Sequence, residues 1–428
     1  MTRTRLTLVL MALPFSAYGD EIAREGRQTT EKTPAGWTFV MEKHPSLRFG
    51  KLLRVDFRAK LQNDFRAFNP EVGTDEGAYA MNRARIGVEG RFLKTFEFEL
   101  ERELANTQNP WKDAFINWRR FRRVQIKAGK FKAPFGMEQL VGPTQTDFIY
   151  RAGISEYLVP GRDIGVMAHG RFFGRGLNFA AGLFRHDGDN ARIKDNERGA
   201  GRTFAARLTG VPLRRMPVPT LLKDLELGAA FTIGEVEEGS NSLRGRTVSK
   251  NYFFRRLDVN GRRLRFGTEM KWAHGPFGIN GEYIQVSDER RGQGLAGDDL
   301  SDLVSRGWYL SGVWTLFDRT EGPNAKHQSF AKSVYEPNSI GAMQFAIRYE
   351  QLRFGSREHA GRPSRDSRAA NIFGNSDRAL TFGANWMINR HTRIQVNAVH
   401  EKIEDIQRSP IAGREHFWTR LCRLQFVL

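Results

Sequence analysis

Apolar and polar residues alternate with a period of two along most of the chain. Between residues 51 and 62, the odd positions from Leu53 to Leu61 are all apolar, whereas the even positions from Arg54 to Gln62 are polar or charged. Strict alternation of this kind predicts a β-strand with one apolar face. That face carries no charge, as contact with lipid requires, because a lysine or arginine at the membrane midplane costs about 2–4 kcal/mol.

The same alternation recurs at least nine more times. Clear cases lie near 83–92, 96–101, 163–172, 225–233, 264–272, 308–316, 344–349, 380–386 and 393–398. Weaker cases lie near 113–118, 124–131, 177–184, 203–209, 277–286 and 416–428. We predict an all-β protein, a transmembrane antiparallel β-barrel of about sixteen strands, an even number as in bacterial barrels. A soluble β-sandwich or β-helix is the alternative, but the many aromatic faces and the lack of a 20–50-residue repeat favour the barrel.

The connections between predicted strands differ in length in a regular way. Short ones lie near 92–95, 119–122, 173–176, 273–276 and 388–391. Long polar ones lie near 63–80, 132–162, 185–202, 235–262, 287–306, 353–378 and 401–415. Short periplasmic turns and long outer loops are typical of outer-membrane barrels. The segment 318–339 departs from this pattern, because it is long where a short turn is expected.

The first residues of the chain are organised like a secretory signal peptide. A basic start with Arg3 and Arg5 is followed by an apolar run, which is too short for a membrane-anchor helix, and then by small residues. We expect cleavage near Gly19/Asp20. The predicted division is a signal peptide (1–19), an N-terminal periplasmic segment (20–49) and the barrel (50–428).

The composition is consistent with a water-filled barrel. The formal net charge is +19 and the mean hydropathy is −0.52, yet the chain contains 32 Phe and 43 Gly. Half of each strand in such a barrel faces water, which keeps the mean hydropathy low while aromatic residues face lipid.

No pattern of catalytic or cofactor-binding residues is present. Cys422 is the single cysteine, so neither an intrachain disulfide nor a thiolate metal cluster can form. His400 and Glu401 are not followed by the second histidine of a metalloprotease motif. We expect no enzyme activity, no cofactor and no metal site; a barrel esterase or phospholipase is the enzyme alternative. The basic residues are spread over alternating strands, which argues against nucleic-acid binding.

Three stretches resemble the phosphate-selective porin O and P family. They are AGKFKAPFGME at 128–138, PGRDIGV at 160–166, and the hairpin at 380–401. The resemblance implies a porin-type barrel, a homotrimer, basic side chains along the pore and an inward-folded loop at 132–162. The chain departs from the usual pattern at its last residue, Leu428, where outer-membrane barrels usually have an aromatic residue.

Basic side chains on the inner faces are the candidate pore-lining, anion-binding residues, because rings of arginine and lysine favour anions. Arginine also binds phosphate oxygens bidentately, whereas lysine acts as a point charge. From alternation and from the loop at 132–162, the candidates are Arg54, Arg58, Lys60, Arg83, Arg85, Arg91, Lys127, Lys130, Lys132, Arg151, Arg162, Arg171, Arg207, Arg265, Lys271, Arg348, Arg393 and Arg423. The alternative is that many of them are held in salt bridges. Arg91 and Glu97, for example, flank the turn at 92–95 symmetrically, which predicts a cross-strand ion pair.

We therefore predict an outer-membrane porin that forms an anion-selective channel for passive diffusion, with phosphate or polyphosphate as the preferred solute. Two alternatives are a general porin without phosphate preference and a plugged structural or adhesive barrel. The expected partners are small anions, two further copies of the chain, and outer-membrane lipid and lipopolysaccharide, whose phosphates attract a basic protein.

Overall fold

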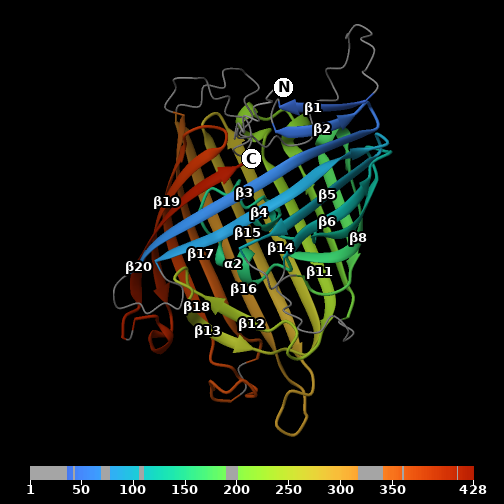
Figure 1. Ribbon diagram of the computed structural model, residues 1–428. Helices are drawn as coiled ribbons and strands as arrows, with labels where there is room; N and C mark the ends of the chain where they lie inside the picture. Colours follow the sequence, from blue (N-terminus) through green and yellow to red (C-terminus); the bar gives the residue numbers. More distant parts are fainter. Residues whose placement is uncertain are drawn as a thin grey trace, which may run out of the picture.

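The computed structural model describes residues 36–41, 44–68, 78–105, 110–188, 201–316, 341–358, 361–411 and 413–428. These residues form a closed antiparallel β-barrel of sixteen strands (Figure 1). The fold class predicted from the alternation is confirmed. Across the same residues, no helix is long and apolar enough to span a membrane.

Each barrel strand pairs with the barrel strands that precede and follow it, and the barrel closes where β20 pairs with β3, from Lys60↔Val427 to Phe68↔Thr419. The strands are β3(Leu53–Phe68), β4(Tyr79–Phe92), β5(Phe96–Glu103), β6(Trp111–Trp118), β7(Gln125–Lys132), β8(Arg162–Phe172), β9(Leu177–Phe184), β10(Thr203–Gly210), β11(Glu226–Val236), β14(Gly261–His274), β15(Phe277–Arg290), β16(Leu300–Leu316), β17(Ala342–Ser356), β18(Asn375–Met387), β19(Thr392–Ile403) and β20(His416–Val427).

Alternation decides which side of the barrel each residue faces. On β3, Phe57 is exposed on the outer face, whereas Asp56 and Lys60 are buried toward the lumen. Ile86 on β4 and Leu310 on β16 are exposed in the same way as Phe57. Large apolar side chains on the outside and charged ones inside are the arrangement that a membrane stabilises.

Short connections gather at one end of the barrel. In the β4–β5 turn, Leu93 and Lys94 both have positive φ (49° and 60°), which closes a tight hairpin. The last residue of the chain, marked C in Figure 1, also lies at this end, which is therefore the periplasmic one. The β10–β11 connection is longer and contains the 3-10 turns η3(Pro212–Arg215) and η4(Thr220–Leu222). The long segment between β16 and β17 also starts and finishes here, but residues 317–340 lie outside the described ones.

Two short strands precede the barrel. β1(Trp37–Met41) and β2(Pro45–Phe49) form a hairpin, and β2 pairs with the first residues of β3, from Leu53 to Asp56. This is the edge of β3 that β20 uses further along. The predicted signal peptide, residues 1–19, lies outside the described residues.

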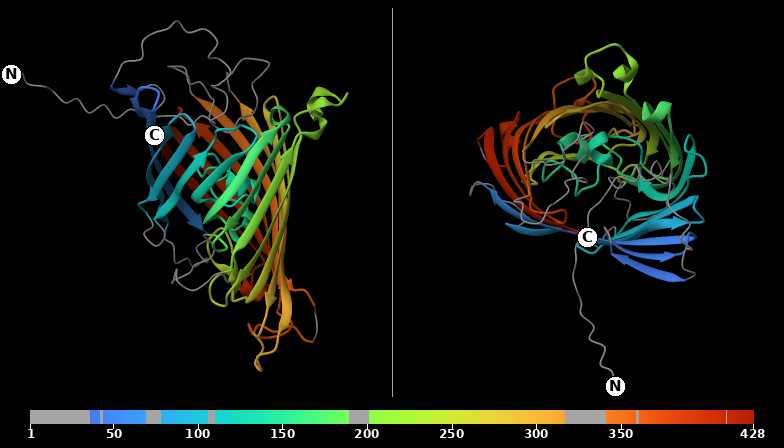
Figure 2. Two further views of the ribbon diagram at one scale, coloured as in Figure 1. Left: turned by 90° about the vertical axis from the view of Figure 1, so that its right-hand side faces the viewer. Right: turned by 90° about the horizontal axis from the view of Figure 1, so that it is seen from above.

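Two segments from the opposite, outer end occupy the lumen (Figure 2). Residues 133–161, the lumen loop, connect β7 to β8 and contain α1(Met137–Leu140) and α2(Gly153–Tyr157). The second segment connects β11 to β14 and contains a hairpin of β12(Leu243–Arg246) and β13(Tyr252–Leu257), the lumen hairpin.

The lumen hairpin corrects a prediction, because the sequence suggests only a long polar outer loop at 235–262. The aromatic rings of Phe254 and Phe354, the latter from β17, are stacked with centroids 4.6 Å apart, and both residues are buried. Ile154 and Leu158 of the lumen loop belong to the same apolar cluster. Burying these side chains holds both segments inside the barrel.

Candidate functional site

The lumen loop reaches across the barrel from β7 and β8 to the opposite wall. The backbone N–H of Glu138 donates to the Glu282 carboxylate on β15 (3.0 Å), and the N–H of Gly153 donates to Glu350 on β17 (2.9 Å). Hydrogen bonds to charged groups are stronger than those between neutral groups. The loop therefore narrows the channel at a fixed position.

Arginines of the barrel wall hold the middle of the loop. Arg348 on β17 is 3.1 Å from the carboxylate of Glu138. Arg423 on β20 forms an ion pair with Asp64 (2.6 Å) and donates to the carbonyl oxygen of Ile149 (2.8 Å). These side chains join the loop to strands that are distant from it in the sequence.

Four predicted pore-lining arginines are consequently not available to a passing solute. Arg265, Arg348, Arg393 and Arg423 point to the inside of the barrel, but each is at most 4% exposed. The lumen loop covers them: Arg265, for instance, donates to the carbonyl oxygen of Leu158 (2.7 Å). The structure corrects the prediction for these four residues, of which Arg265, Arg348 and Arg423 anchor the loop.

Lys130 is a second correction. In the register of β7 it lies opposite Ala114 of β6 and Ile164 of β8, and Ile164 is exposed on the outer face. Directly opposed residues in an antiparallel sheet share a face. Lys130 therefore lies on the outside of the barrel and does not line the pore.

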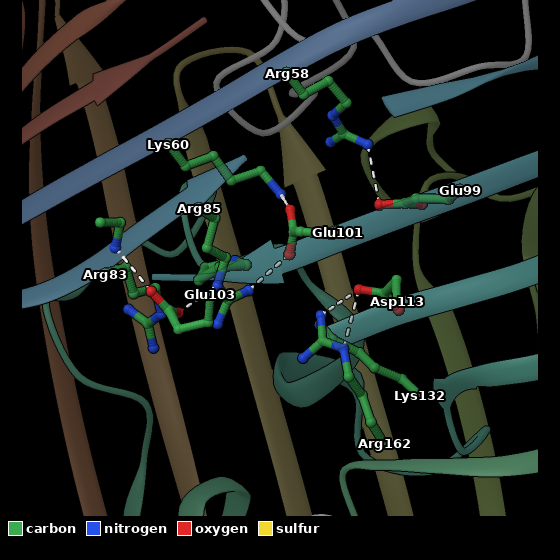
Figure 3. A network of polar contacts seen from close by, with 12 residues as sticks. Arg58, Lys60, Arg83, Arg85, Glu99, Glu101, Glu103, Asp113, Lys132 and Arg162 are labelled. Carbon is green, nitrogen blue, oxygen red and sulfur yellow. Dashed lines mark hydrogen bonds and ion pairs between the residues drawn. The ribbon is translucent and has the colours of Figure 1, made fainter. Parts of the chain in front are cut away.

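The side of the lumen loop that faces β3–β8 meets a wall of paired charges (Figure 3). Lys60 is paired with Glu101. Arg85 binds the same carboxylate (2.9 Å) and Glu103 (2.7 Å), all from neighbouring strands. The carboxylates of β5 thus neutralise part of the basic charge of β3 and β4.

Arg162, at the start of β8, binds Asp113 of β6 through two nitrogen atoms (2.6 and 3.0 Å). We refer to the basic residues gathered here as the lumen cluster: Lys60, Arg83, Arg85, Lys132, Arg151 and Arg162. The described carboxylates that pair with them are fewer: Glu101, Glu103 and Asp113.

Three members of the lumen cluster bind only neutral oxygen atoms among the described residues. Arg83 donates to the side-chain oxygen of Gln62 (2.6 Å). Lys132 and Arg151 each donate to the backbone carbonyl oxygen of Val141 (2.9 and 3.0 Å). Their positive charges therefore have no paired carboxylate in this part of the chain. Arg83 and Lys132 both lie within electrostatic reach of Arg151.

The carboxyl group of Glu156 in α2 lies in a region of positive electrostatic potential. Desolvation inside the lumen works against its ionisation, but the positive charges of Lys250, Arg151 and Arg83 hold the pKa of Glu156 below its ordinary value. Lys250 belongs to the lumen hairpin, so both inward segments contribute charge to this region.

Other candidates line the lumen nearer the periplasmic end, where they are paired. Arg54 binds Asp56 (2.9 Å), and Arg58 binds glutamates of β4 and β5. Arg91 lies 3.5 Å from Glu97, directly across the β4–β5 pair. The cross-strand ion pair predicted from their symmetric placement about the turn is confirmed.

The remaining candidates are dispersed around the inner wall. The ammonium group of Lys127 lies 4.2 Å from an aromatic ring centre, a cation–π contact. Arg207 binds Glu269 (3.0 Å), and with Lys271 these residues border a hollow of about 260 Å³ beside α1. Arg171 is exposed on the inner face of β8. None of these four belongs to the lumen cluster.

Sequence reasoning did not identify Asp113, Glu156 or Lys250 as part of the site. Asp113 follows the alternation of β6, and the signal was therefore present in the chain. Glu156 and Lys250 are carried by segments outside the barrel strands, where alternation gives no information.

A sixteen-stranded barrel with an apolar outside and a charged lumen narrowed by an inserted loop is a porin. Residues 54–427 match the family described as phosphate-selective porin O and P. The chain belongs to this family.

Individual relatives agree with this assignment. Porin O of Pseudomonas aeruginosa is 21% identical to the chain, and the match covers 97% of this chain and 96% of that protein. The barrel is similar to the trimer form of OmpT, an outer membrane protein of Vibrio cholerae, with a TM-score of 0.54, 11% identity and coverage of 88% and 100% of the two chains. It is also similar to the anion-selective porin from Comamonas acidovorans, with a TM-score of 0.51, 10% identity and coverage of 88% and 100%.

The predicted function is thereby confirmed at the level of the family: the chain is an anion-selective porin of the bacterial outer membrane. It is a channel rather than an enzyme.

Proposed function

We propose that the lumen cluster is the selectivity site of this porin and that it prefers phosphate and polyphosphate to other small anions. Solutes diffuse passively between the lumen loop and the wall formed by β3–β8. The same two surfaces supply the cations, so a solute meets basic groups from both sides.

One observation carries this proposal. Arg83, Lys132 and Arg151 have only neutral oxygen partners among the described residues, and they come from β4, β7 and the lumen loop. Cations of like sign held close together repel one another unless an anion lies between them. Glu156 lies within electrostatic reach of Arg83 and Arg151 and relieves part of that repulsion; a phosphate group in this position would relieve the rest.

The chemistry of the side chains favours an oxyanion with several oxygen atoms. Guanidinium groups such as those of Arg83 and Arg151 can each bind two phosphate oxygens, while Lys132 supplies a point charge. The paired cations, Arg85 and Arg162, offer further contacts along the wall. Several contacts of moderate strength allow an anion to enter and still leave.

The test is the reversal potential of the purified porin in a planar bilayer across a KCl gradient, followed by titration with inorganic phosphate. We expect chloride selectivity in the wild type and a fall in chloride current as phosphate occupies the site. In the variant K132Q/R151Q, which keeps hydrogen-bond donors but removes two charges, we expect weaker selectivity and at least tenfold weaker block, about 1.4 kcal/mol.

The matched control is K223Q, which removes a charge in the periplasmic β10–β11 connection and should behave as the wild type. Selectivity for anions without any block by phosphate would contradict the phosphate preference. Equal block in K132Q/R151Q and the wild type would place the phosphate site elsewhere.

We also propose that the porin is a homotrimer. β5, β6 and β7 have eight residues each and form a short wall (Figure 2). Strands of this length, tilted by about 45°, climb roughly 19 Å, which is less than the apolar band of about 25 Å. Contact with a second copy would cover this wall. Lys130 on its outer face supports protein contact there rather than lipid contact.

Export requires removal of the N-terminal signal. We propose that the mature chain begins at Asp20, because small residues precede this position after the apolar run. N-terminal sequencing of the porin from outer membranes identifies the first residue directly.

A further inference from the structure

Basic residues oppose one another on the outer face of the tallest part of the barrel. Arg306 of β16 lies directly opposite Arg353 of β17. Two strands further along the sheet, Arg378 of β18 lies directly opposite Lys402 of β19. Like charges in directly opposed positions destabilise a sheet. This arrangement therefore calls for a negative partner.

The described part of the chain supplies little compensating charge. Arg353 approaches Glu404 at 3.7 Å and Lys402 approaches Glu415 at 3.2 Å, with all four side chains about half exposed. For Arg306 and Arg378, no carboxylate of the described residues lies within ion-pair distance.

A hollow of about 690 Å³ lies beside the first of these pairs. Arg306, Arg353 and Arg357 line it together with apolar groups that include Val304 and Phe373. Arg357 approaches Asp302 at 3.3 Å and is exposed on its other side. A cavity with arginines beside apolar side chains suits an amphiphile, whose charged head and hydrocarbon part need different surroundings.

The hollow lies at the level of lipid headgroups. Along the outer face of β16, the next outward residue after Arg306 is Trp308, whose ring lies 5.5 Å from that of Tyr349. Further along, Trp314 lies 6.2 Å from Phe345. At a tilt of about 45°, the ten residues from Arg306 to Leu316, the periplasmic end of β16, climb roughly 24 Å, which is about the height of the apolar band. Arg306 therefore lies at the outer edge of this band, toward the long connections.

We propose that this outward-facing arginine hollow binds the phosphorylated headgroup of a lipid in the outer leaflet of the outer membrane. The guanidinium groups of Arg306 and Arg353 bind phosphate oxygens, and Arg378 extends the site along the wall. The acyl chains follow the apolar band below Trp308. Clusters of basic residues at a membrane interface bind anionic lipid headgroups in this way.

The site is independent of the channel. Its arginines Arg306, Arg353 and Arg378 lie on the outer face of the barrel, whereas the lumen cluster faces inward on β3–β8 and the lumen loop. A lipid is favoured over free phosphate because the hollow is partly apolar and its arginines lie on the outer face of the barrel. It is favoured over a second copy of the chain because β16 and β17, with seventeen and fifteen residues, are long enough to cross the bilayer without protein cover.

The experiment uses the full-length porin in detergent and diphosphoryl lipid A as the probe, with bound lipid counted by native mass spectrometry. We expect the double variant R306Q/R378Q to bind lipid A about tenfold more weakly than the wild type. The charge-conserving variant R306K/R378K should retain most of the binding. R256Q/R291Q removes two exposed arginines elsewhere at the outer end and should bind as the wild type does.

Three results would overturn the proposal. The first is equal binding of lipid A to R306Q/R378Q and the wild type. The second is equal binding of lipid A from which the phosphates have been removed, or complete displacement by inorganic phosphate, which would indicate a site for the free ion. The third is loss of assembly in R306Q/R378Q, which would indicate contact between copies. Reversal potentials at 1 M KCl should be the same in all these variants. A failure of the lipid-site proposal can therefore be told apart from a failure of the proposal that the lumen cluster selects anions.

Discussion

At the scale of single residues, the protein places carboxylates where arginines are buried. Asp187, in the connection after β9, accepts from Arg263 and from Arg265 of β14 at 2.7 and 2.6 Å. All three side chains are buried. Burial works against ionisation of Asp187, but the two guanidinium groups outweigh it and lower its pKa. The carboxylate thus ties an outer connection to the barrel wall.

We expect Asp187→Asn to destabilise the folded porin by about 3 kcal/mol at pH 7, because it leaves two buried arginines without their shared counter-charge. The pKa of Asp187 is lower in the folded state than in the unfolded state. Its contribution is therefore complete above about pH 3.9, the ordinary pKa, and is lost as the pH falls through the folded value. Unfolding by guanidinium in detergent micelles gives the unfolding free energies of the wild type and of D187N at pH 7 and at low pH.

The difference in unfolding free energy between wild type and D187N should shrink as the pH is lowered below 4. The control is D258N, since Asp258 pairs with Arg256 on the surface with both side chains exposed. Removal of an exposed pair should change stability by less than about 1 kcal/mol. A D187N difference that stays constant from pH 7 downward would rule out the charged bridge.

At the scale of elements, the barrel strands are predictable from the sequence because a strand between lipid and water is a local pattern. The weak segment near 203–209 proves to be β10, and the one near 277–286 proves to be the first part of β15. The lumen hairpin is not predictable in this way. Its position depends on packing of Phe254 against Phe354, one hundred residues further along the chain. Alternation reports the face of a strand but not what covers that face.

The same limit applies to the candidate site. Alternation identifies the inner faces that carry Arg83, Arg85 and Lys60. It cannot distinguish Arg83, which donates to Gln62, from Arg423, which is buried under the lumen loop, because both lie on inner faces. That distinction requires the path of a loop through three-dimensional space. The side that Lys130 faces follows from the alternation of β7, where it lies opposite Ala114 and Ile164, and not from the loop that comes after it.

The short wall makes a prediction about assembly. Ile116 of β6 is 50% exposed on its outer face, and Ile347 of β17 is 47% exposed on the tall wall. If the short wall contacts a second copy, Ile116→Arg should convert trimers to monomers. Ile347→Arg carries the same change on a wall that faces lipid and should leave the trimer intact. Light scattering in detergent gives the mass of each assembly.

I116R and I347R each place one arginine on the outer face of the barrel, so both variants carry a similar free-energy cost of membrane insertion. Trimers of I116R would contradict the short-wall interface. Monomers in both variants would show that the loss reflects damaged insertion and not a specific contact. A wild type that is monomeric at all concentrations would contradict the trimer itself.

At the scale of the whole molecule, two electrostatic fields act on an anion. One is the long-range field of a chain whose formal net charge is +19, including exposed arginines of the outer connections such as Arg256 and Arg291. The other is the short-range field of the lumen cluster. Salt distinguishes them, because the screening length falls from about 30 Å at 0.01 M to about 3 Å at 1 M. Salt hardly screens the attraction between an anion and the Arg83 and Arg151 side chains that it contacts. It does screen the attraction of an anion that is still approaching the outer end.

We therefore expect the wild-type porin to remain anion-selective at 1 M KCl. K132Q/R151Q should lose most of that selectivity at 1 M but retain part of it at 0.01 M, where the long-range field persists. R256Q/R291Q should show the reverse: weaker selectivity at low salt and wild-type selectivity at 1 M. Reversal potentials at a fixed concentration ratio across this range of salt concentrations give the anion selectivity of all three proteins.

Parallel loss of selectivity in both variants at every salt concentration would mean that selectivity comes from net charge alone. The lumen cluster would then have no separate role. Divergent salt dependence would assign attraction to the outer end and selection to the three cations that lie between the lumen loop and the wall.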